Sequence, residues 1–507
     1  MLLYSYHNLN LFLSKKIDPH TTTSDQNQFN FRERNHLTEM VEEILEAAEP
    51  AAEKLENFDG KIRLVGQYDA DGISATAIAH EMLDRLGKEF EYEIVKQLYE
   101  EDVERIAEED EGLILFVDIG SGQAEHIQNH IIEEAGKEVI VSDHHEPQID
   151  DEDLKEKSES NEDSNFIHIN PHFDGIDGGE SISAAGTTYL LAEQVDEDNV
   201  DLVQYALIGA TGDVQKQEGE FLGLNKQLLE RAEENDLIEK RQGLDLYGRS
   251  TKPLHKSLMY TTDPHLEGIS NNESGAVQFV QSSGVDIKDE KGDFKTLSDL
   301  SEEEEKKLIH ALITQGYDAH QLMNNIYELP NGHGIDEFST IINACGRLGE
   351  PKKGVKILLE DDLDLAEKIS RKYGRKISSA LGYVEDNEDN TEVIYENGIG
   401  VIDGKDQVED DFIGTVTTIT MSNGFFSDVP AIVGVAESDK DKIKASCRAT
   451  KEAVENGLNL GHVIEEVCEE IDGEGGGHNV AAGAKFPREN KEEFLEKVSE
   501  GIVEEVQ

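Results

Sequence analysis

The sequence predicts a mixed α/β protein with three parts: a parallel-sheet domain, a mainly helical connector and a smaller α/β domain. Short apolar runs alternate with helical patterns from about residue 61 to 215, and this alternation is typical of a parallel sheet. Helical patterns then dominate, and strand-like runs return after about residue 390. With 507 residues, the chain is long enough for each part to bury its own core.

The charge balance changes near the start of the chain. Residues 1–40 hold four acids and four bases, whereas the rest is strongly acidic. We therefore expect a disordered tail, or a start codon assigned too early with Met40 as the natural start. The parallel-sheet domain is expected over 41–215, the helical connector over 216–389 and the second α/β domain over 390–507.

The first domain opens on an amphipathic helix, LTEMVEEILEAAEPAAEKLENF. Its five expected strands are KIRLVGQ, YEIVKQL, LILFVDIG, EVIVSDHH and FIHINP. Between the last two strands, the stretch 148–165 is acidic and poor in apolar residues. We expect that stretch to be a mobile loop.

In the connector, one helix is predicted to begin with a capping box formed by Ser301 and Glu304. In the second α/β domain the strand-like runs are GIGVIDG, AIVGVA and KIKASCR, and the run DGEGGGHNVAAGAKF precedes a final helix. The three cysteines lack metal-binding C-x-x-C spacing, which indicates a reduced protein. No run approaches the 18 apolar residues of a membrane helix, and the start does not resemble a signal peptide. We therefore expect a cytoplasmic protein with no membrane contact.

Acidic residues outnumber basic ones by 110 to 46, which gives a formal net charge of −64. The acids are spread through periodic apolar segments, so we interpret them as a solvated surface. Self-repulsion of this size destabilises a compact chain in dilute buffer, whereas in molar salt the Debye length falls to about 3 Å. The composition therefore predicts a halophile's protein that is unstable at low salt.

Aspartates and histidines follow several of the expected strands. Asp69 and Asp71 follow the first strand, Asp118 follows the third, and Asp143, His144 and His145 follow the fourth. The carboxyl ends of parallel strands meet at one edge of a sheet, where ligands bind. Any one aspartate of so acidic a chain is more often a surface residue, but the joint pattern predicts a metal site.

Carboxylate and imidazole groups together suit Mn²⁺ or Mg²⁺ better than an ion that prefers thiolates. Four to six such ligands can hold a pair of ions, and two ions about 3.5–4 Å apart are a standard device for phosphoester hydrolysis. We predict two divalent cations, Mn²⁺ first and Mg²⁺ as the alternative.

Several stretches resemble the motifs of the DHH superfamily of phosphoesterases. These are YDADGISATAIAH, LFVDIGSG, VSDHHEP and ALIGATGDV, in the order of the family's four motifs. INPHFDGIDGGESISAAGTTYLLA resembles the RecJ-type sequence, GGGHNVAAGAKF the hallmark of the DHHA1 domain, and DEFSTIINACGRLGEPKKG the archaeal RecJ-like nucleases. The resemblance implies a metal-dependent exonuclease that acts on single-stranded nucleic acid.

The resemblance also implies a role for each matching residue. The implied metal ligands are Asp69, Asp71, Asp118, His144 and Asp213, with Asp118 placed to bridge both ions. Asp143 and His145 are implied as catalytic residues that support them, and His145 could contact the scissile phosphate. Many relatives have His or Asp where this chain has Gln67, so the occupancy of one ion site stays open.

The glycine run of the second domain is a candidate phosphate-binding site. Gly475, Gly476 and Gly477 would let backbone N–H groups approach an anion closely, and Arg448 and His478 would complete the grip. A glycine cluster on its own is more often a plain turn. The resemblance to a DHHA1 domain favours phosphate binding.

Four basic stretches stand out against the acidic background: 241–264, 347–356, 368–376 and 442–451. We expect them to guide a nucleic-acid strand, with tyrosines stacking on bases. The expected path residues are Arg241, Tyr247, Arg249, Lys252, Tyr260, Arg371 and Arg375. The alternative is that these bases serve helix C-termini or contacts with a partner.

Three functions stay open. The first is an exonuclease on single-stranded DNA or RNA, acting in replication or repair. The second is a phosphodiesterase of the same superfamily with a small substrate, such as a cyclic dinucleotide or a short oligonucleotide. The third is a largely non-catalytic accessory factor of the replicative helicase, and the resemblance implies the GINS complex as a partner. The intact ligand set argues against this third function.

Overall fold

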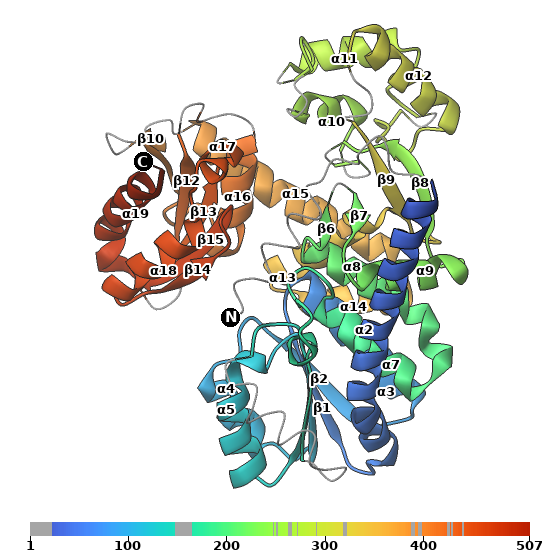
Figure 1. Cartoon of the computed structure of the whole chain (residues 1–507). Coiled ribbons are helices and arrows are strands. Elements are labelled where there is room, and N and C mark those ends of the chain that lie inside the picture. Colours follow the sequence, from blue (N-terminus) through green and yellow to red (C-terminus); the bar gives the residue numbers. More distant parts are fainter. Residues whose placement is uncertain are drawn as a thin grey trace. The chain divides into compact units, whose positions relative to one another are not determined.

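The computed structural model divides the chain into two compact units, which are described separately (Figure 1). Unit 1 consists of Met1–Gln67 and Ile78–Leu237, and unit 2 of Tyr68–Ala77 and Ile238–Gln507. The structure describes residues 23–506 except 148–164, 218, 247, 250–251, 262–265, 271, 290–291, 318–321, 387–390, 394–397, 423–425, 427–428 and 439–440. The predicted loop 148–165 and the predicted path residue Tyr247 therefore lie outside the described residues, apart from residue 165.

Five parallel strands form the sheet of unit 1, in the order β2-β1-β3-β4-β5. They are β1 (Ile62–Gln67), β2 (Phe90–Val95), β3 (Leu113–Val117), β4 (Glu138–Ser142) and β5 (Phe166–Ile169). The central strand β3 is buried along its whole length, which explains its uninterrupted apolar sequence. Each of the five strands overlaps one of the five expected runs, with β2 beginning two residues before its run, and the predicted α/β fold class is confirmed.

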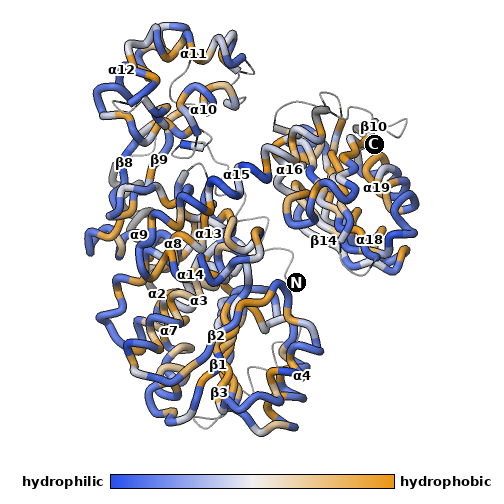
Figure 2. The backbone as a smooth tube through the Cα atoms, turned by 180° about the vertical axis from the view of Figure 1, so that it is seen from behind, coloured by the Kyte–Doolittle hydropathy of each residue, from blue (hydrophilic) through white to orange (hydrophobic). Residues whose placement is uncertain are grey.

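Helices cover both faces of this sheet. On one face α7 (Ala184–Val195) packs against β3 and β4, and its other neighbours are α2 (Thr23–Asn57) and α8 (Val203–Gly212). On the other face α4 (Glu100–Glu108) packs against η2 (Ile127–Glu134), a π-helix that continues α5 (Ala124–His126). Strand residues such as Phe116 share a hydrophobic core with Val103 and Ile131 on that face. Figure 2 shows hydrophobic colour along β1 and β3.

Two further helices and the N-terminal part of α2 belong to this region of the chain. Helix α3 (Ala70–Arg85) follows β1, and α9 (Asn225–Glu234) packs against α8. Helix α2 begins at Thr23, so residues 23–40 are helical, where the sequence predicted either a disordered tail or a start codon assigned too early. The helical pattern simply extends further toward the N-terminus than its apolar periodicity indicates.

The first half of unit 2 combines a two-stranded sheet with helices. Strands β8 (Glu239–Leu244) and β9 (Met323–Glu328) pair antiparallel. Between them, α10 (Leu254–Tyr260), α11 (Glu273–Ser282) and α12 (Glu302–Thr314) enclose a small hydrophobic core. The predicted capping box is confirmed, since Ser301 Oγ accepts from the Glu304 N–H at 3.3 Å and Glu304 accepts from the Ser301 N–H at 3.1 Å.

The chain continues through α13 (Ile335–Arg347), α14 (Pro351–Glu360) and α15 (Leu363–Asp386) into a six-stranded mixed sheet of order β10-β11-β12-β13-β15-β14. Its strands are β10 (Thr391–Val393), β11 (Ile399–Asp403), β12 (Ala431–Glu437), β13 (Lys442–Ala449), β14 (Glu474–Gly477) and β15 (Ala481–Pro487). Residues of α15 and α16 (Asp410–Ser422) share one core with the sheet, and α18 (Leu460–Glu470) and α19 (Lys491–Val506) share another. The short α17 (Lys451–Glu455) follows β13.

The three cysteines, Cys345, Cys447 and Cys468, are free and buried. In the ranges that the structure describes, no helix combines the length and the apolar character that a membrane span requires.

Two glycines of unit 2 let α13 and α14 approach the turn after β1. A Cβ on Gly346 would lie 1.8 Å from the carbonyl oxygen of Tyr68, and one on Gly354 would lie 2.8 Å from Ile73 Cγ2. These contacts give a physical reason for two of the three glycines in the run DEFSTIINACGRLGEPKKG. The same close contacts hold the turn that carries Asp69 against α13 and α14.

Replacing Gly346 with alanine should therefore lower the thermal unfolding midpoint and the metal-dependent activity together. Overpacking of this kind costs about 1–3 kcal/mol, because the turn must move away from α13. The matched control is Gly374→Ala in α15, where a Cβ would meet nothing within 4 Å and alanine should stabilise the helix by up to about 1 kcal/mol. A thermal scan in molar KCl that gives both variants the same midpoint would contradict this packing argument.

Candidate metal centre

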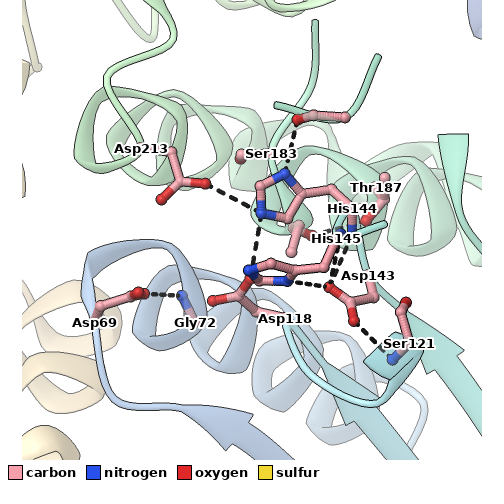
Figure 3. A network of polar contacts seen from close by, with 12 residues as sticks. Asp69, Gly72, Asp118, Ser121, Asp143, His144, His145, Ser183, Thr187 and Asp213 are labelled. Carbon is pink, nitrogen blue, oxygen red and sulfur yellow. Dashed lines mark hydrogen bonds and ion pairs between the residues drawn. The ribbon is translucent and has the colours of Figure 1, made fainter. Parts of the chain in front are cut away.

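Acidic and histidine side chains gather at the carboxyl ends of two central strands of unit 1 (Figure 3). Strand β3 is followed directly by Asp118, strand β4 by Asp143, His144 and His145, and helix α8 by Asp213. Ligand atoms of Asp118, His144 and His145 all lie within 4.8 Å of one another. The predicted convergence at the sheet edge is therefore observed for these residues.

Asp118 is held in an uncommon backbone conformation. Its φ is +59°, its side chain is almost fully buried, and its N–H donates to the Ser142 carbonyl of the neighbouring strand at 3.0 Å. A positive φ is uncommon outside glycine, although aspartate tolerates it better than most residues. The turn thereby places the carboxylate at the end of the sheet, with Oδ1 3.6 Å from His144 Nε2.

The orientation of His144 presents one ring nitrogen to the carboxylates. Its Nδ1 lies 2.8 Å from the Gly178 carbonyl oxygen, and a carbonyl can only accept, so Nδ1 carries the proton of that bond. The opposite nitrogen, Nε2, faces Asp213 Oδ2 at 3.1 Å and Asp118 Oδ1 at 3.6 Å. A histidine fixed through one nitrogen with the other turned toward carboxylates is the usual arrangement of a metal ligand.

Asp143 organises the backbone of the site. Its Oδ1 accepts from the His144 N–H at 2.8 Å and from His145 Nδ1 at 2.8 Å, and its Oδ2 accepts from the Ser121 N–H at 3.0 Å. Burial alone would raise the pKa of Asp143, but the hydrogen bond from His145 and the nearby imidazoles lower it far below its ordinary value. Asp143 is therefore a carboxylate that fixes the two histidines.

His145 is the more exposed of the two histidines, with 51 % of its side chain accessible. Burial would lower the pKa of its imidazole, but the hydrogen bond to Asp143 raises it above the ordinary value. Because Nδ1 is engaged by Asp143, Nε2 is the atom left to meet a substrate or an ion.

The remaining predicted ligands follow β1. The carboxylate of Asp69 accepts from the Gly72 N–H at 3.0 Å and so caps helix α3. Asp71 is buried in the first turn of that helix. Gln67 is the last residue of β1.

A layer of polar residues behind the histidines was not found from the sequence. Burial lowers the pKa of His168 to about 4, so its ring is neutral at neutral pH. Asn170 donates to Ser121 Oγ at 2.9 Å, which leaves the Ser121 hydroxyl to donate to His168 Nε2 at 2.9 Å. Asn170 also donates to the His145 carbonyl. The runs FIHINP and DIGSG contain these residues, but only the fold shows that they touch.

A second part of this layer supports the carbonyl that holds His144. Gln215 is buried, its Nε2 donates to the Gly178 carbonyl at 2.9 Å, and its Oε1 accepts from Asn225 at 2.7 Å. Gly178 therefore accepts from both His144 and Gln215. The chain Asn225–Gln215–Gly178–His144 fixes the ring of the implied ligand.

Replacing Gln215 with leucine should weaken Mn²⁺ binding by about 10–100-fold, the usual cost of losing an outer-shell partner. The change also leaves the buried Asn225 amide without its acceptor, which costs about 1–3 kcal/mol. Mn²⁺ affinity can be measured by titration calorimetry on the full chain. The exposed neighbour Gln217→Leu serves as the control, and equal affinities in the two variants would exclude a supporting role for Gln215.

The donor set fits a divalent cation. Carboxylates and one imidazole nitrogen, buried and already facing one another, are hard and borderline ligands of the kind that Mn²⁺ and Mg²⁺ accept. Close packing of like charges is otherwise costly, and a bound cation would relieve that repulsion.

The predicted phosphate-binding residues lie together in the second sheet of unit 2. Arg448 on β13 is the register partner of Ala481 on β15, next to the turn that contains His478. Its guanidinium donates to the Cys447 carbonyl at 2.8 Å and to Thr418 Oγ1 at 3.0 Å. Burial, together with the nearby Arg347, lowers the pKa of Arg448.

The three glycines of this hairpin differ in what a side chain at each position would contact. A Cβ on Gly475 would lie 2.5 Å from Cys468 Sγ, and Gly477 has a φ of +148°. Gly476 is different, since a Cβ there would meet nothing within 4 Å. The run DGEGGGHNVAAGAKF contains strand β14, the turn after it and part of β15, and it precedes the final helix as predicted. Packing within the hairpin accounts for two of its glycines.

The predicted nucleic-acid path residues differ in their exposure and in their contacts. Arg241 forms ion pairs with Glu305 and Glu328 at 3.2 and 3.0 Å, and Arg249, largely buried, donates to the Leu244 carbonyl. These two arginines make contacts inside the fold, which are neither the predicted contacts with a nucleic-acid strand nor the stated alternative of helix C-termini or a partner. Lys252 Nζ lies 5.8 Å from the centre of the Tyr260 ring. Arg371 and Arg375 are exposed on α15, where Arg371 pairs with Glu367.

Fold and site together define a class of protein: a metal-binding phosphoesterase with a parallel α/β catalytic domain and a second α/β domain. Comparison with family models agrees with this class. Residues 61–212 match the DHH family N-terminal domain, 246–329 the DHH-CID domain and 419–504 the DHHA1 domain.

Two relatives match the chain over very different lengths. It is 31 % identical over 478 residues to the uncharacterized protein MJ0831 of Methanocaldococcus jannaschii, a match that covers 93 % of this chain and all of that protein. Over 90 residues it is 39 % identical to the single-stranded-DNA-specific exonuclease RecJ of Thermus thermophilus, which covers 17 % of this chain and 14 % of RecJ. The chain belongs to the DHH family, as a RecJ-like phosphoesterase with a DHHA1 domain.

Solved structures show the same fold. RecJ of Thermus thermophilus in complex with Mn²⁺ aligns with a TM-score of 0.54 and 18 % identity, over 91 % of this chain and 55 % of RecJ. CDC45 of Entamoeba histolytica aligns with a TM-score of 0.58 and 12 % identity, over 91 % of this chain and 98 % of CDC45. At these identities the likeness concerns the fold.

Proposed function

We propose that this protein is a metal-dependent exonuclease that hydrolyses single-stranded DNA or RNA in replication or repair. The observation that carries the proposal is the orientation of His144, whose Nε2 faces Asp118 and Asp213 because Nδ1 is fixed to Gly178. A site with this preorganisation is built to hold a cation. The match to RecJ over 90 residues supports a nucleic-acid substrate.

In this proposal Asp71, Asp118, His144 and Asp213 hold two divalent cations, Mn²⁺ in the first place, and Asp69 completes the set. Bound there, such ions would activate water and offset the charge that develops on the phosphate. The role of Asp143 is to keep the histidines in place through its three hydrogen bonds to their backbone and ring atoms. His145, held through Nδ1, would direct Nε2 to the scissile phosphate.

The second domain would bind the strand beyond the cleavage point. Arg448 on β13 lies beside the turn of the β14–β15 hairpin that contains His478, where a phosphate would meet a guanidinium and backbone N–H groups. On α15, Arg371 and Arg375 offer exposed charges for the strand to follow. A small substrate such as a dinucleotide would not need these positions.

The assay is the release of nucleotides from oligonucleotides labelled at the 5′ or the 3′ end, as DNA and as RNA, with Mn²⁺ in molar KCl. We expect stepwise shortening of single strands, and its loss on chelation. Hydrolysis of dinucleotides with no shortening of longer strands would instead support the small-substrate alternative. No hydrolysis of any of these substrates would refute the proposal.

We also propose that the protein works at high salt, because its net charge is −64. Raising KCl from dilute to molar concentration should raise the thermal unfolding midpoint, since the Debye length shortens from about 10 Å at 0.1 M to about 3 Å at 1 M. A thermal scan in KCl and in NaCl measures the effect. A midpoint that is independent of salt would contradict it.

The partner that we propose is the GINS complex of the replicative helicase, on the basis of the family resemblance. Co-elution of the two from a sizing column in molar KCl would support it, and separate elution over a range of concentrations would oppose it. A purely accessory role is disfavoured by the intact carboxylate and imidazole groups at the ends of β3 and β4.

A further inference from the structure

Another group of possible metal ligands lies in unit 1, on the helices that follow β2 and β3. Glu100 at the start of α4, His126 at the end of α5 and His130 in η2 offer ligand atoms that lie within 4.8 Å of one another. His126 Nδ1 is 3.3 Å and His130 Nε2 is 3.5 Å from the same oxygen, Glu100 Oε1. The two imidazole rings are nearly parallel, with centres 6.4 Å apart.

The orientation of His130 resembles that of a metal ligand. Its Nδ1 is 3.1 Å from Glu134 Oε2, and this contact turns Nε2 toward Glu100. A carboxylate that holds one nitrogen of a histidine, with the other nitrogen aimed at a ligand group, is a recurring outer-shell arrangement at zinc sites. The contact between His130 and Glu134 is a separate observation from the short distances among the three ligand atoms.

The local backbone also places the histidines. Residues Ile127–Glu134 form a π-helix, a rare conformation that is frequent at functional sites. Helix α4 and the π-helix pack against each other (Figure 1), and Val103 and Ile131 join them to the sheet in one hydrophobic core. The ligands therefore come from two elements whose relative position is fixed by packing.

We propose that Glu100, His126 and His130 form a binding site for a transition-metal ion, Zn²⁺ in the first place. Two imidazoles and a carboxylate are a common set of three protein ligands for zinc, with water in the fourth position. This set is softer than the carboxylate-rich catalytic group, so it should prefer Zn²⁺ or Co²⁺ to Mg²⁺. The ion would link α4 to the helix that follows Asp118 and its turn, and so stabilise that side of the sheet.

The test counts bound zinc on the full chain after dialysis, by plasma emission, in the wild type and in the variant with His126→Gln and His130→Gln. We expect about one zinc fewer per chain in the double variant, and no loss in the exposed control Glu125→Gln. Co²⁺ should give a visible d–d absorption that survives Asp118→Asn but disappears in the double variant. Asp118 lies outside the proposed zinc site. Comparing Asp118→Asn with the double histidine variant therefore distinguishes the zinc site from the candidate metal centre at the strand ends.

Stability supplies a second readout. Zn²⁺ that binds only the folded chain should raise the thermal unfolding midpoint of the wild type by mass action, and it should do so less in the double variant. Should the double variant fail to fold, His126→Gln alone must weaken zinc binding by about tenfold or more. Equal zinc content and equal Co²⁺ spectra in the wild type and the histidine variants would overturn the proposal and leave an ion-pair cluster only.

Discussion

Asp118→Asn should reduce the rate of Mn²⁺-dependent hydrolysis by on the order of 10³-fold. Loss of an outer-shell partner already costs about 10–100-fold, and Asp118 is a buried carboxylate that faces both histidines of the motif, at 3.6 and 3.8 Å. Asparagine has the same shape and tolerates the positive φ of this position, so the fold should persist. The loss of activity would then result from the loss of one carboxylate charge.

The control for this variant is Asp110→Asn, an exposed aspartate that precedes β3 at its opposite end. Both proteins should unfold at similar temperatures without metal, and only Asp118→Asn should lose activity. Nucleotide release under single-turnover conditions measures the chemical step. Wild-type activity in the Asp118→Asn variant would show that Asp118 is not a ligand of the metal centre.

Gly178→Ala should abolish most activity although Gly178 has no side chain to contribute. A Cβ at this position would lie 2.1 Å from the His144 carbonyl oxygen and 3.0 Å from His172 Nε2. The clash must displace His144, or the carbonyl of Gly178 that orients it. A misplacement of about 1 Å at a catalytic site can cost roughly 10²-fold in rate, so we expect at least that loss, together with weaker Mn²⁺ binding.

Gly179→Ala is the matched control for this second variant. The nearest atom to its Cβ would be Asp177 Oδ1 at 3.2 Å, a side-chain atom that can move. Steady-state kinetics and Mn²⁺ titration of the two variants separate a local clash from a general effect on the loop. Similar losses in both variants would show that the loop, and not the contact with His144, limits activity.

The sequence predicted the sheet because each strand is an apolar run between helical patterns, and β3 needs no alternation since both of its faces are buried. It predicted the place of Asp118, Asp143 and His144 because strand ends of a parallel sheet share one edge. These two inferences depend on local pattern and on a general rule of topology.

Other features depend on contacts between distant segments, so the sequence alone could not show them. The Gly178 carbonyl meets both His144 and Gln215 only after α8 and the loop before α7 are folded. Similarly, the basic stretch around Arg241 predicts a binding residue, but Arg241 lies on strand β8 and pairs with Glu305 of helix α12. Glu100 is separated from His126 by a strand, and only helix packing brings them together.

The most direct test of the metal centre is to count Mn²⁺ bound to the full chain, by electron paramagnetic resonance during titration in molar KCl, in the wild type and in His144→Gln. We predict two bound ions in the wild type with the spectrum of a coupled pair, and loss of the pair in His144→Gln, with hydrolysis lost in parallel. Unchanged binding of a coupled pair in His144→Gln would contradict the account, because the oriented imidazole would then hold no ion.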